Sequence, residues 1–180
     1  MEAVTLGILA GGQGTRLGGR DKGLLINDGL PLVSQLASSS VGLQEIIVNC
    51  HGNPWSYQHY ANRLICDLQP EGGPVRGMAT LIWACQSPLL AVLPCDQLAP
   101  PQGWIEHLLS QLGNAPGIFI EQGGHHSPCC LLRPRRLTQV AMETSNANLA
   151  LRDWYQRLGI TGAPYPDWPH DVDRWSDMAK

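Results

Sequence analysis

The sequence predicts an α/β fold: a single-domain, Rossmann-like sandwich with a mostly parallel central sheet and helices on both faces. Short apolar runs alternate along the chain with longer stretches of helical character, which is the pattern of such folds. The run at residues 89–93 is apolar throughout and flanked by prolines, which is typical of a strand buried on both faces. A length of 180 residues suits one compact domain, which we expect to span residues 1–180.

Four strands are expected in the first half of the chain. Each is a short apolar run, and they cover residues 4–9, 45–49, 63–66 and 89–93. Pro31 suits the first turn of a helix that we expect to reach residue 41, and Pro74 likewise begins a helix that runs through residue 86. A glycine-rich loop separates the first strand from the first helix.

The second half is expected to add two strands and further helices. A helix over residues 103–112 precedes strands at 117–121 and 128–132, with a Gly-Gly turn between the strands. These two strands form either a hairpin or a small separate sheet edge. One or two helices are expected between residues 135 and 158, followed by a polar tail.

The composition argues against nucleic-acid, membrane and zinc-binding roles. The formal net charge is −3 and no Lys/Arg cluster stands out, so we expect no nucleic-acid partner. No apolar stretch approaches the roughly 20 residues that cross a bilayer, and no secretory signal is seen, so the protein is expected to be cytoplasmic. The six cysteines form no C-x-x-C pair, which is the usual spacing of zinc and thioredoxin sites.

The glycine-rich loop after the first strand is the most informative segment. Five glycines in nine positions let the backbone approach a ligand closely and point N–H groups toward it. Arg16, Arg20 and Lys22 bring positive charge to the same loop. Backbone donors and cations together are what a triphosphate requires, so the loop predicts a nucleotide site.

Two familiar phosphate-binding loops do not fit this segment. A P-loop needs Gly-Lys followed by Ser or Thr, and that sequence does not occur in the chain. The dinucleotide motif G-x-G-x-x-G fails because Gly12 and Gly14 are followed by Gly18, one residue too late. The strand that ends at Asn49 also lacks the acidic residue that would bind a ribose.

Polar residues follow three of the predicted strands. Ligands bind at the carboxyl ends of parallel strands, so we expect Asn49, Asp67 and Asp96 to converge near the glycine-rich loop. Asp96 follows the most buried strand, where a carboxylate is well placed to hold a hard cation such as Mg²⁺. The alternative for Asp96 is a helix N-cap, and Asn49 and Asp67 taken alone fit strand-end capping.

The loop resembles the L-A-G-G-x-x-x-R-M-G-G-x-D-K signature of molybdenum cofactor guanylyltransferases. It reads LAGGQGTRLGGRDK, with Leu17 in place of Met. Residues 47–50, 73–77 and 94–96 resemble the family's V-V-N-A, G-P-L-A-G and P-C-D motifs. The resemblance implies that Asp96 binds Mg²⁺ and that the nucleotide is contacted by Leu9, Ala10, Gly11, Gly12, Lys22, Asn49, Asp67 and Asp96.

Three positions depart from the family pattern. Arg76 replaces a small residue of the G-P-L-A-G turn, and Leu98 stands where the family usually has Pro. Asp171-Val172-Asp173 occupies the place of N-x-N-T-P, and related cytidylyltransferases more often have D-x-D there. Asp173 is a candidate second Mg²⁺ ligand, with a solvated tail charge as the alternative.

The resemblance implies transfer of GMP from GTP to molybdopterin, the organic part of the molybdenum cofactor, with release of pyrophosphate. Arg16 and Lys22 would offset the charge on the departing pyrophosphate, and Asp96 would hold the metal. Cofactor-delivery proteins or molybdoenzyme chaperones are possible further partners. Two alternatives stay open: transfer of CMP or another nucleotide to molybdopterin or a sugar phosphate, and a catalytically silent nucleotide-binding module.

Overall fold

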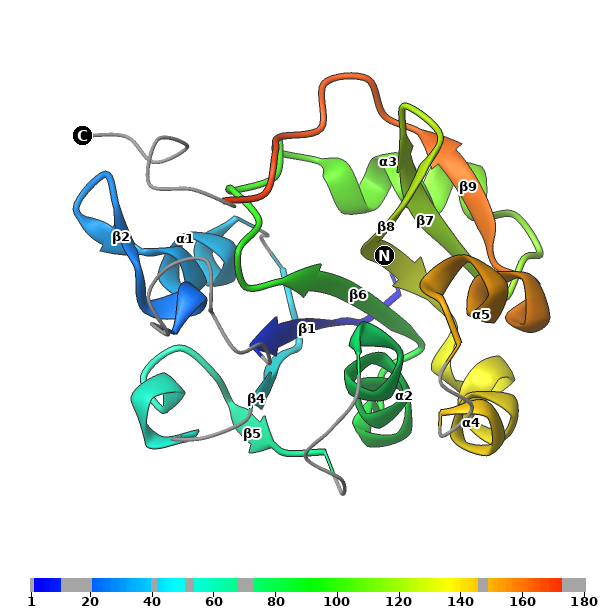
Figure 1. Cartoon of the computed structure of the whole chain (residues 1–180), viewed down its shortest axis with the longest axis horizontal. Helices are drawn as coiled ribbons and strands as arrows, with labels where there is room; N and C mark the ends of the chain where they lie inside the picture. Colours follow the sequence, from blue (N-terminus) through cyan, green and yellow to red (C-terminus); the bar gives the residue numbers. More distant parts are fainter. Residues whose placement is uncertain are drawn as a thin grey trace.

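The computed structural model describes residues 2–10, 21–39, 42–50, 54–67, 73–145 and 149–172. Within these residues a central sheet contains seven strands, β1 (Val4–Ala10), β4 (Glu45–Cys50), β5 (Arg63–Ile65), β6 (Leu89–Pro94), β7 (Gly117–Gln122), β8 (His125–Leu132) and β9 (Thr161–Pro164). The five α-helices among them are α1 (Leu32–Ser38), α2 (Pro74–Ala84), α3 (Trp104–Leu112), α4 (Pro134–Thr144) and α5 (Leu151–Leu158). Figure 1 shows their arrangement.

The strands lie in the order β5-β4-β1-β6-β8-β7-β9. Strands β5, β4, β1 and β6 are parallel to one another, β8 runs antiparallel to β6 and β7, and β9 is parallel to β7. The expected mostly parallel sheet is therefore confirmed, and so is the central place of β6. Strands β7 and β8 form the expected hairpin, and the alternative of a separate sheet edge is wrong because β8 pairs directly with β6.

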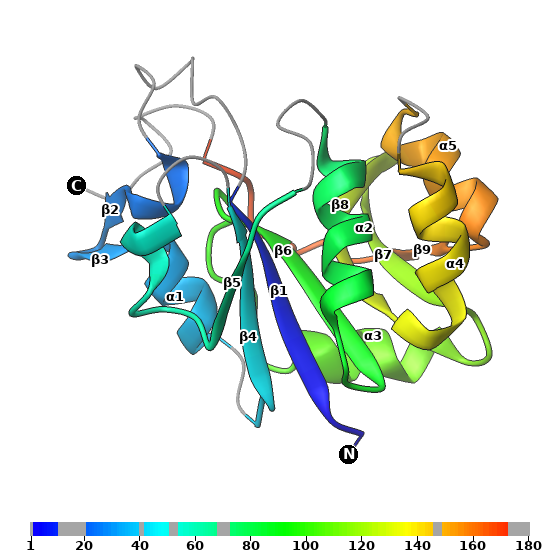
Figure 2. The same cartoon turned by 90° about the horizontal axis from the view of Figure 1, so that it is seen from below.

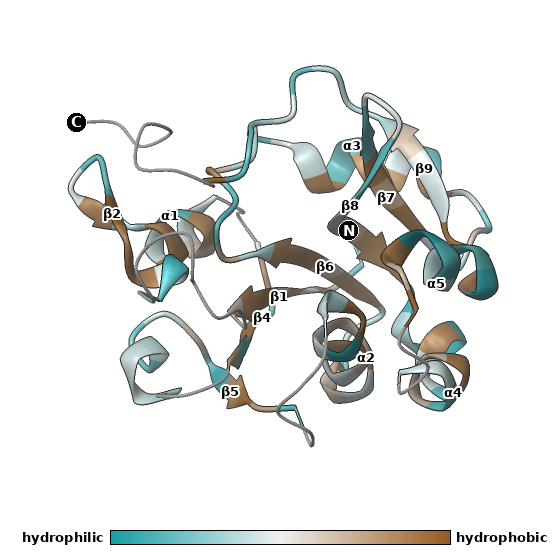
Figure 3. Ribbon diagram, viewed as in Figure 1, coloured by the Kyte–Doolittle hydropathy of each residue, from teal (hydrophilic) through white to brown (hydrophobic). Residues whose placement is uncertain are grey.

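The sheet separates two apolar layers, as Figure 2 shows. Helices α1 and α3 cover one face, whereas α2, α4 and α5 cover the other. Side chains of each strand alternate between the two layers: Leu89 and Ala91 of β6 face the first, and Leu90 and Val92 face the second. In Figure 3 the strands β1, β4 and β6 are mostly brown, that is, apolar, whereas helix α5 is mostly teal.

Each helix differs from its predicted range by a few residues at most, which is the usual uncertainty of helix ends. Helix α1 ends at Ser38, and residues 40–41 of its predicted range lie outside the described part of the chain. None of the helices in the described residues combines the length and the apolar character needed to cross a membrane.

Two strand pairings were not predicted. Strands β2 (Ile26–Asn27) and β3 (Leu30–Pro31) form a small hairpin whose turn is Asp28-Gly29, both with positive φ. Asp-Gly is a favoured pair in such turns. Strand β9 lies in the predicted polar tail, where it adds an edge to the sheet beside β7.

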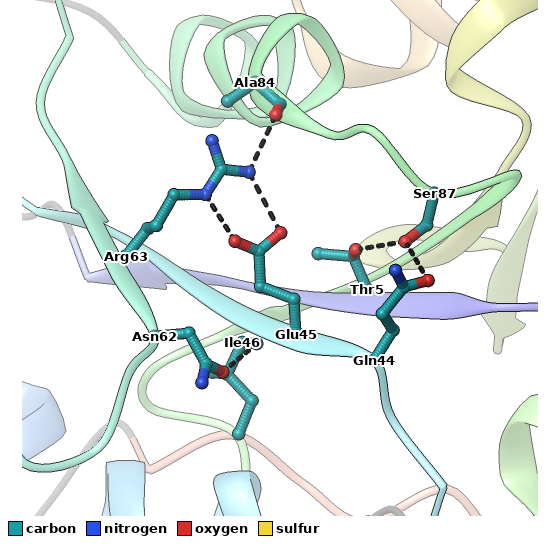
Figure 4. A network of polar contacts seen from close by, with 8 residues as sticks. All are labelled: Thr5, Gln44, Glu45, Ile46, Asn62, Arg63, Ala84 and Ser87. Carbon is teal, nitrogen blue, oxygen red and sulfur yellow. Dashed lines mark hydrogen bonds and ion pairs between the residues drawn. The ribbon is translucent and has the colours of Figure 1, made fainter.

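Polar side chains fasten the edge of the sheet where β1, β4 and β6 begin, as Figure 4 shows. Arg63 binds the Glu45 carboxylate with two nitrogens and donates to the Ala84 carbonyl at 2.9 Å, so β5 and β4 are tied to the end of α2. Thr5 and Ser87, both buried, share a hydrogen bond of 2.8 Å between β1 and the start of β6. The opposite edge, where the strands end, carries the predicted site.

Candidate active site

The carboxyl ends of β1, β4 and β6 meet at one edge of the sheet. Leu9 of β1 is in register with Asn49 of β4 and with Pro94 of β6. The Cys95 amide donates to the Leu9 carbonyl at 2.9 Å, which holds the turn after β6 against β1. This register brings Asn49 and Asp96 to the same edge, at the point where the glycine-rich segment leaves β1 (upper edge of Figure 2).

Lys22 and Asp96 form the charged centre of this edge. The Lys22 Nζ lies 2.6 Å from Asp96 Oδ2, and the two side chains are 21% and 20% exposed. Lys22 begins the short 3-10 helix η2 (Lys22–Leu24), whose N-cap is Asp21. Lys22, which follows the glycine-rich segment in the sequence, and the strand-end carboxylate of Asp96 were predicted separately, and the structure brings these two side chains together.

Asn49 and Asp67 form a second polar pair beside the first. The buried Asn49 donates through Nδ2 to Asp67 Oδ1 at 2.8 Å, and Thr80 of α2 donates its hydroxyl to the same oxygen at 2.8 Å. These two neutral donors help to hold the Asp67 carboxylate in place. The side chains therefore bind one another across two strand ends and a helix.

Gly77 allows α2 to approach the site closely. A Cβ at this position would lie 2.8 Å from Leu9 Cδ2 and 3.0 Å from Asn49 Oδ1, closer than ordinary packing distances. Any larger residue would therefore displace Asn49 or Leu9. Gly77 matches the last glycine of the family's G-P-L-A-G motif, and in this chain close packing explains why a glycine stands there.

The chain returns to Asp96 near its C-terminal end. The Val172 amide donates to the Asp96 carbonyl at 2.7 Å, and Gln97 forms a bridge with Asp171. The buried Gln97 side chain donates to the Pro169 carbonyl at 2.8 Å and accepts from the Trp168 indole at 3.0 Å. Residues 168–172 are therefore fastened beside the Asp96 turn, and Asp173, the candidate second metal ligand, lies just outside the described residues.

Six of the predicted site residues can be placed with their surroundings, and four cannot. Leu9 and Ala10 are buried, so they can reach a ligand only through backbone atoms. Lys22, Asn49, Asp67 and Asp96 all lie at the same sheet edge, as two bonded pairs. Gly11, Gly12, Arg16 and Asp173 fall outside the residues that the structure describes.

Sequence reasoning missed Thr80 and Tyr57. Thr80 is the single uncharged polar residue of α2, and its hydroxyl contacts Asp67. Its polarity within an otherwise mostly apolar helix is the only feature of the sequence that could have indicated this contact. The Tyr57 hydroxyl donates to Asp21, next to Lys22, although its side chain is completely buried. Nothing in the sequence near Tyr57 indicates this contact.

Solved structures share this fold at low sequence identity. A molybdopterin-guanine dinucleotide biosynthesis protein A from Archaeoglobus fulgidus is 16% identical, with a TM-score of 0.71 over 89% of this chain and 83% of that one. A 4-diphosphocytidyl-2C-methyl-D-erythritol synthase from Anaerococcus prevotii is 8% identical, with a TM-score of 0.75 over 98% of this chain and 92% of that one. These likenesses concern the fold alone.

Relatives of higher identity are named molybdenum cofactor guanylyltransferase. One from Pseudomonas paraeruginosa is 38% identical over 136 residues, which cover 73% of this chain and 69% of the relative. Another from Ectopseudomonas mendocina is 32% identical over 162 residues, covering 88% and 80% of the two chains. The family model for the MobA-like NTP transferase domain matches residues 6–161, which include both bonded pairs of the site. The chain is therefore a nucleotidyltransferase that belongs to the family of MobA-like NTP transferase domains.

Proposed function

We propose that this protein transfers GMP from GTP to molybdopterin, releasing pyrophosphate and forming a guanine dinucleotide cofactor. The observation that carries the proposal is the Lys22–Asp96 pair at the strand ends, where a cation and a carboxylate lie 2.6 Å apart. Phosphoryl chemistry of this kind needs both, because positive charge must meet the phosphates and a carboxylate must hold a metal. The name shared by the relatives supports guanine and molybdopterin as substrates.

The donor set at Asp96 fits Mg²⁺ if substrate oxygens complete it. Among the described residues no three His, Cys, Asp or Glu side chains lie close enough together to hold a metal ion by themselves. Mg²⁺ is usually held by one or two carboxylates together with phosphate oxygens and water, so Asp96 with Asp173 as a second ligand would suffice. When bound, the ion would neutralise phosphate charge as the phosphoryl group is transferred.

The protein groups act by positioning and by offsetting charge. The attacking substrate phosphate is already an anion, so the reaction requires no protein base and no covalent intermediate. Asn49 and Asp67 are proposed to bind the nucleoside part, together with backbone groups of Leu9, Ala10, Gly11 and Gly12. Lys22 and Arg16 are proposed to meet the charge that builds on pyrophosphate as it leaves.

We also propose that residues 1–180 act as one nucleotidyltransferase domain in the cytoplasm. The family match over residues 6–161 supports a single nucleotidyltransferase domain across these residues. A cofactor-delivery protein or a molybdoenzyme chaperone is proposed as a further partner. We propose no nucleic-acid partner, in keeping with the formal net charge of −3.

One experiment tests the function directly. The protein is incubated with Mg²⁺, molybdopterin and each nucleoside triphosphate in turn, and pyrophosphate is followed, with Asp96→Asn as the control. Release with GTP supports the proposal. Release with CTP alone would replace it with cytidylyl transfer, which the acidic Asp171-x-Asp173 motif favours, and release with none would favour a silent nucleotide-binding module.

A further inference from the structure

Tyr57 contacts the turn that carries Lys22. It ends the 3-10 helix η3 (Pro54–Tyr57), and its side chain is completely buried in the apolar layer beneath α1 and α3. Its hydroxyl donates to Asp21 Oδ1, 36 positions earlier in the chain. A buried hydroxyl that reaches a carboxylate next to a site lysine calls for an explanation beyond packing.

Asp21 fixes the backbone of that turn. Its Oδ1 accepts from the Gly23 amide at 3.2 Å, and its carbonyl accepts from the Leu24 amide at 3.2 Å. Asp21 is therefore the N-cap of η2, the short helix in which Lys22 is the first residue. The same carboxylate oxygen receives the Tyr57 hydroxyl, so the tyrosine and the cap act on one atom.

Gly23 shows how closely the parts fit. A Cβ at Gly23 would lie 2.7 Å from the Tyr57 hydroxyl oxygen and 3.1 Å from Cys95 Cβ. The backbone at Gly23 is therefore packed between the side chains of Tyr57 and Cys95. Because Cys95 directly precedes Asp96, this packing helps to set the distance between the turn that carries Lys22 and the turn that carries Asp96.

The Tyr57 phenol keeps its proton in this setting. Burial raises the pKa of Tyr57 far above its ordinary value, and the neighbouring Cys95 and Asp21 raise it further. Tyr57 therefore stays protonated at neutral pH and acts as an O–H donor to Asp21.

We infer that Tyr57 is a positioning residue for phosphate binding, which acts through Asp21 to hold Lys22 opposite Asp96. The inference rests on the proposed function, because that function gives the Lys22 ammonium its phosphate partner. Tyr57 itself touches neither substrate nor metal. Its effect must therefore appear in interactions with phosphate and vanish when Asp21 or Lys22 is removed.

The first test is Tyr57→Phe, which removes the hydroxyl and keeps the ring. We expect the Kd for GTP, measured by calorimetry, and the inhibition constant of pyrophosphate each to rise about tenfold, while the KM for molybdopterin stays unchanged. Tyr155→Phe is the matched control, because it removes an equally buried hydroxyl, bound to the Ser127 carbonyl at 2.9 Å, from the other face of the sheet. It should alter neither constant.

A double-mutant cycle separates this role from a general loss of stability. Asp21→Ala should weaken GTP binding at least as much as Tyr57→Phe, and adding Tyr57→Phe to Asp21→Ala should change little more. Asp21→Asn keeps an acceptor oxygen and should retain most of the affinity. A full additional loss in the double variant, or a Tyr57→Phe protein that binds GTP and pyrophosphate like the wild type, would overturn the inference.

These outcomes are independent of the acceptor. Suppose that the wild-type protein binds GTP but no nucleoside triphosphate leads to pyrophosphate release. The proposed function then fails, while the double-mutant cycle of GTP binding still tests the role of Tyr57. If the wild-type protein turns over and the cycle shows no coupling, the inference about Tyr57 fails and the function stands.

Discussion

The Lys22 ammonium and the Asp96 carboxylate neutralise each other across 2.6 Å, although they lie 74 positions apart in the chain. Each group therefore holds the other in place across the strand ends. Under the proposed function, bound nucleotide would exchange this ion pair for new ones, with phosphate at Lys22 and metal at Asp96. Without this ion pair, the two charged side chains would be more mobile at the ends of the strands.

We expect Asp96→Asn and Lys22→Ala each to abolish turnover while the fold persists. Each change removes a charge that acts on the reacting phosphates, and such losses typically lower kcat by about 10² to 10³ or more. Pyrophosphate release gives the activity and circular dichroism gives the fold. Wild-type pyrophosphate release by either folded variant would show that the site is wrongly assigned.

Gly77→Ala should weaken nucleotide binding without unfolding the protein. The new Cβ would meet Leu9 Cδ2 at 2.8 Å and Asn49 Oδ1 at 3.0 Å, so Leu9 or Asn49 must shift, and a shift of Asn49 would disturb its hydrogen bond to Asp67. We expect the KM for GTP to rise about tenfold, as after the loss of a hydrogen bond to a charged group. Gly73→Ala is the control, because a Cβ at Gly73 meets nothing within 4 Å; equal effects from both would refute the packing explanation.

Thr80→Val should reduce GTP affinity by removing one of two donors to Asp67. Valine keeps the shape of threonine and lacks the hydroxyl that reaches Asp67 Oδ1 at 2.8 Å. An effect of about fivefold on the KM for GTP is expected from one lost charge-assisted hydrogen bond. Thr80→Ser keeps the hydroxyl and should restore most of the affinity, so a serine variant as weak as the valine variant would speak against this role.

Stability should fall above pH 9 in part because of Cys130. Burial raises the pKa of the Cys130 thiol to about 12 from an ordinary value of 9.0. The unfolded chain then releases a proton that the folded chain keeps, so the contribution is complete below pH 9 and is lost as pH rises toward 12. Between neutral pH and about pH 10, the free energy of unfolding in urea should fall by about 1 kcal/mol less for Cys130→Ala than for the wild type. Parallel curves for the two proteins would contradict this.

Gln97→Leu should destabilise the protein by about 3 kcal/mol, because it leaves the Trp168 indole and the Pro169 carbonyl without their buried partner. Urea unfolding measures the change. Gln111→Leu removes an exposed amide from α3 and serves as the control, with an expected effect within about 0.5 kcal/mol. A similar small effect at Gln97 would mean that residues 168–172 are held by other contacts.

The strands that the sequence predicted correctly, and the polar residues that it placed at their ends, share one property: the neighbouring residues in the sequence indicate their environment. Strand β6 is buried on both faces, so its whole sequence is apolar, and Asp96 is conspicuous directly after it. Asn49 and Asp67 follow apolar strands in the same way. Parallel pairing then brings such strand ends together whatever the intervening sequence.

Features that depend on distant partners were not predictable in this way. Strand β9, of sequence TGAP, has no apolar alternation and forms because β7 offers it an open edge. Thr80 and Tyr57 resemble ordinary helix and core residues until their partners, Asp67 and Asp21, are placed in space. Gln97 likewise gains its role from Trp168 and Pro169, which come about 70 positions later.

The insertion of β8 between β6 and β7 has a consequence for how the protein is made. The ribosome synthesises β6 well before residues 125–132, which form β8. Until β8 is made, the apolar strand β6 has no partner on one side. Unpaired strand edges of this kind template association with other chains. Nascent chains that stop short of β8 should therefore depend on chaperones. A fragment that ends before residue 125 should likewise aggregate when it is produced alone.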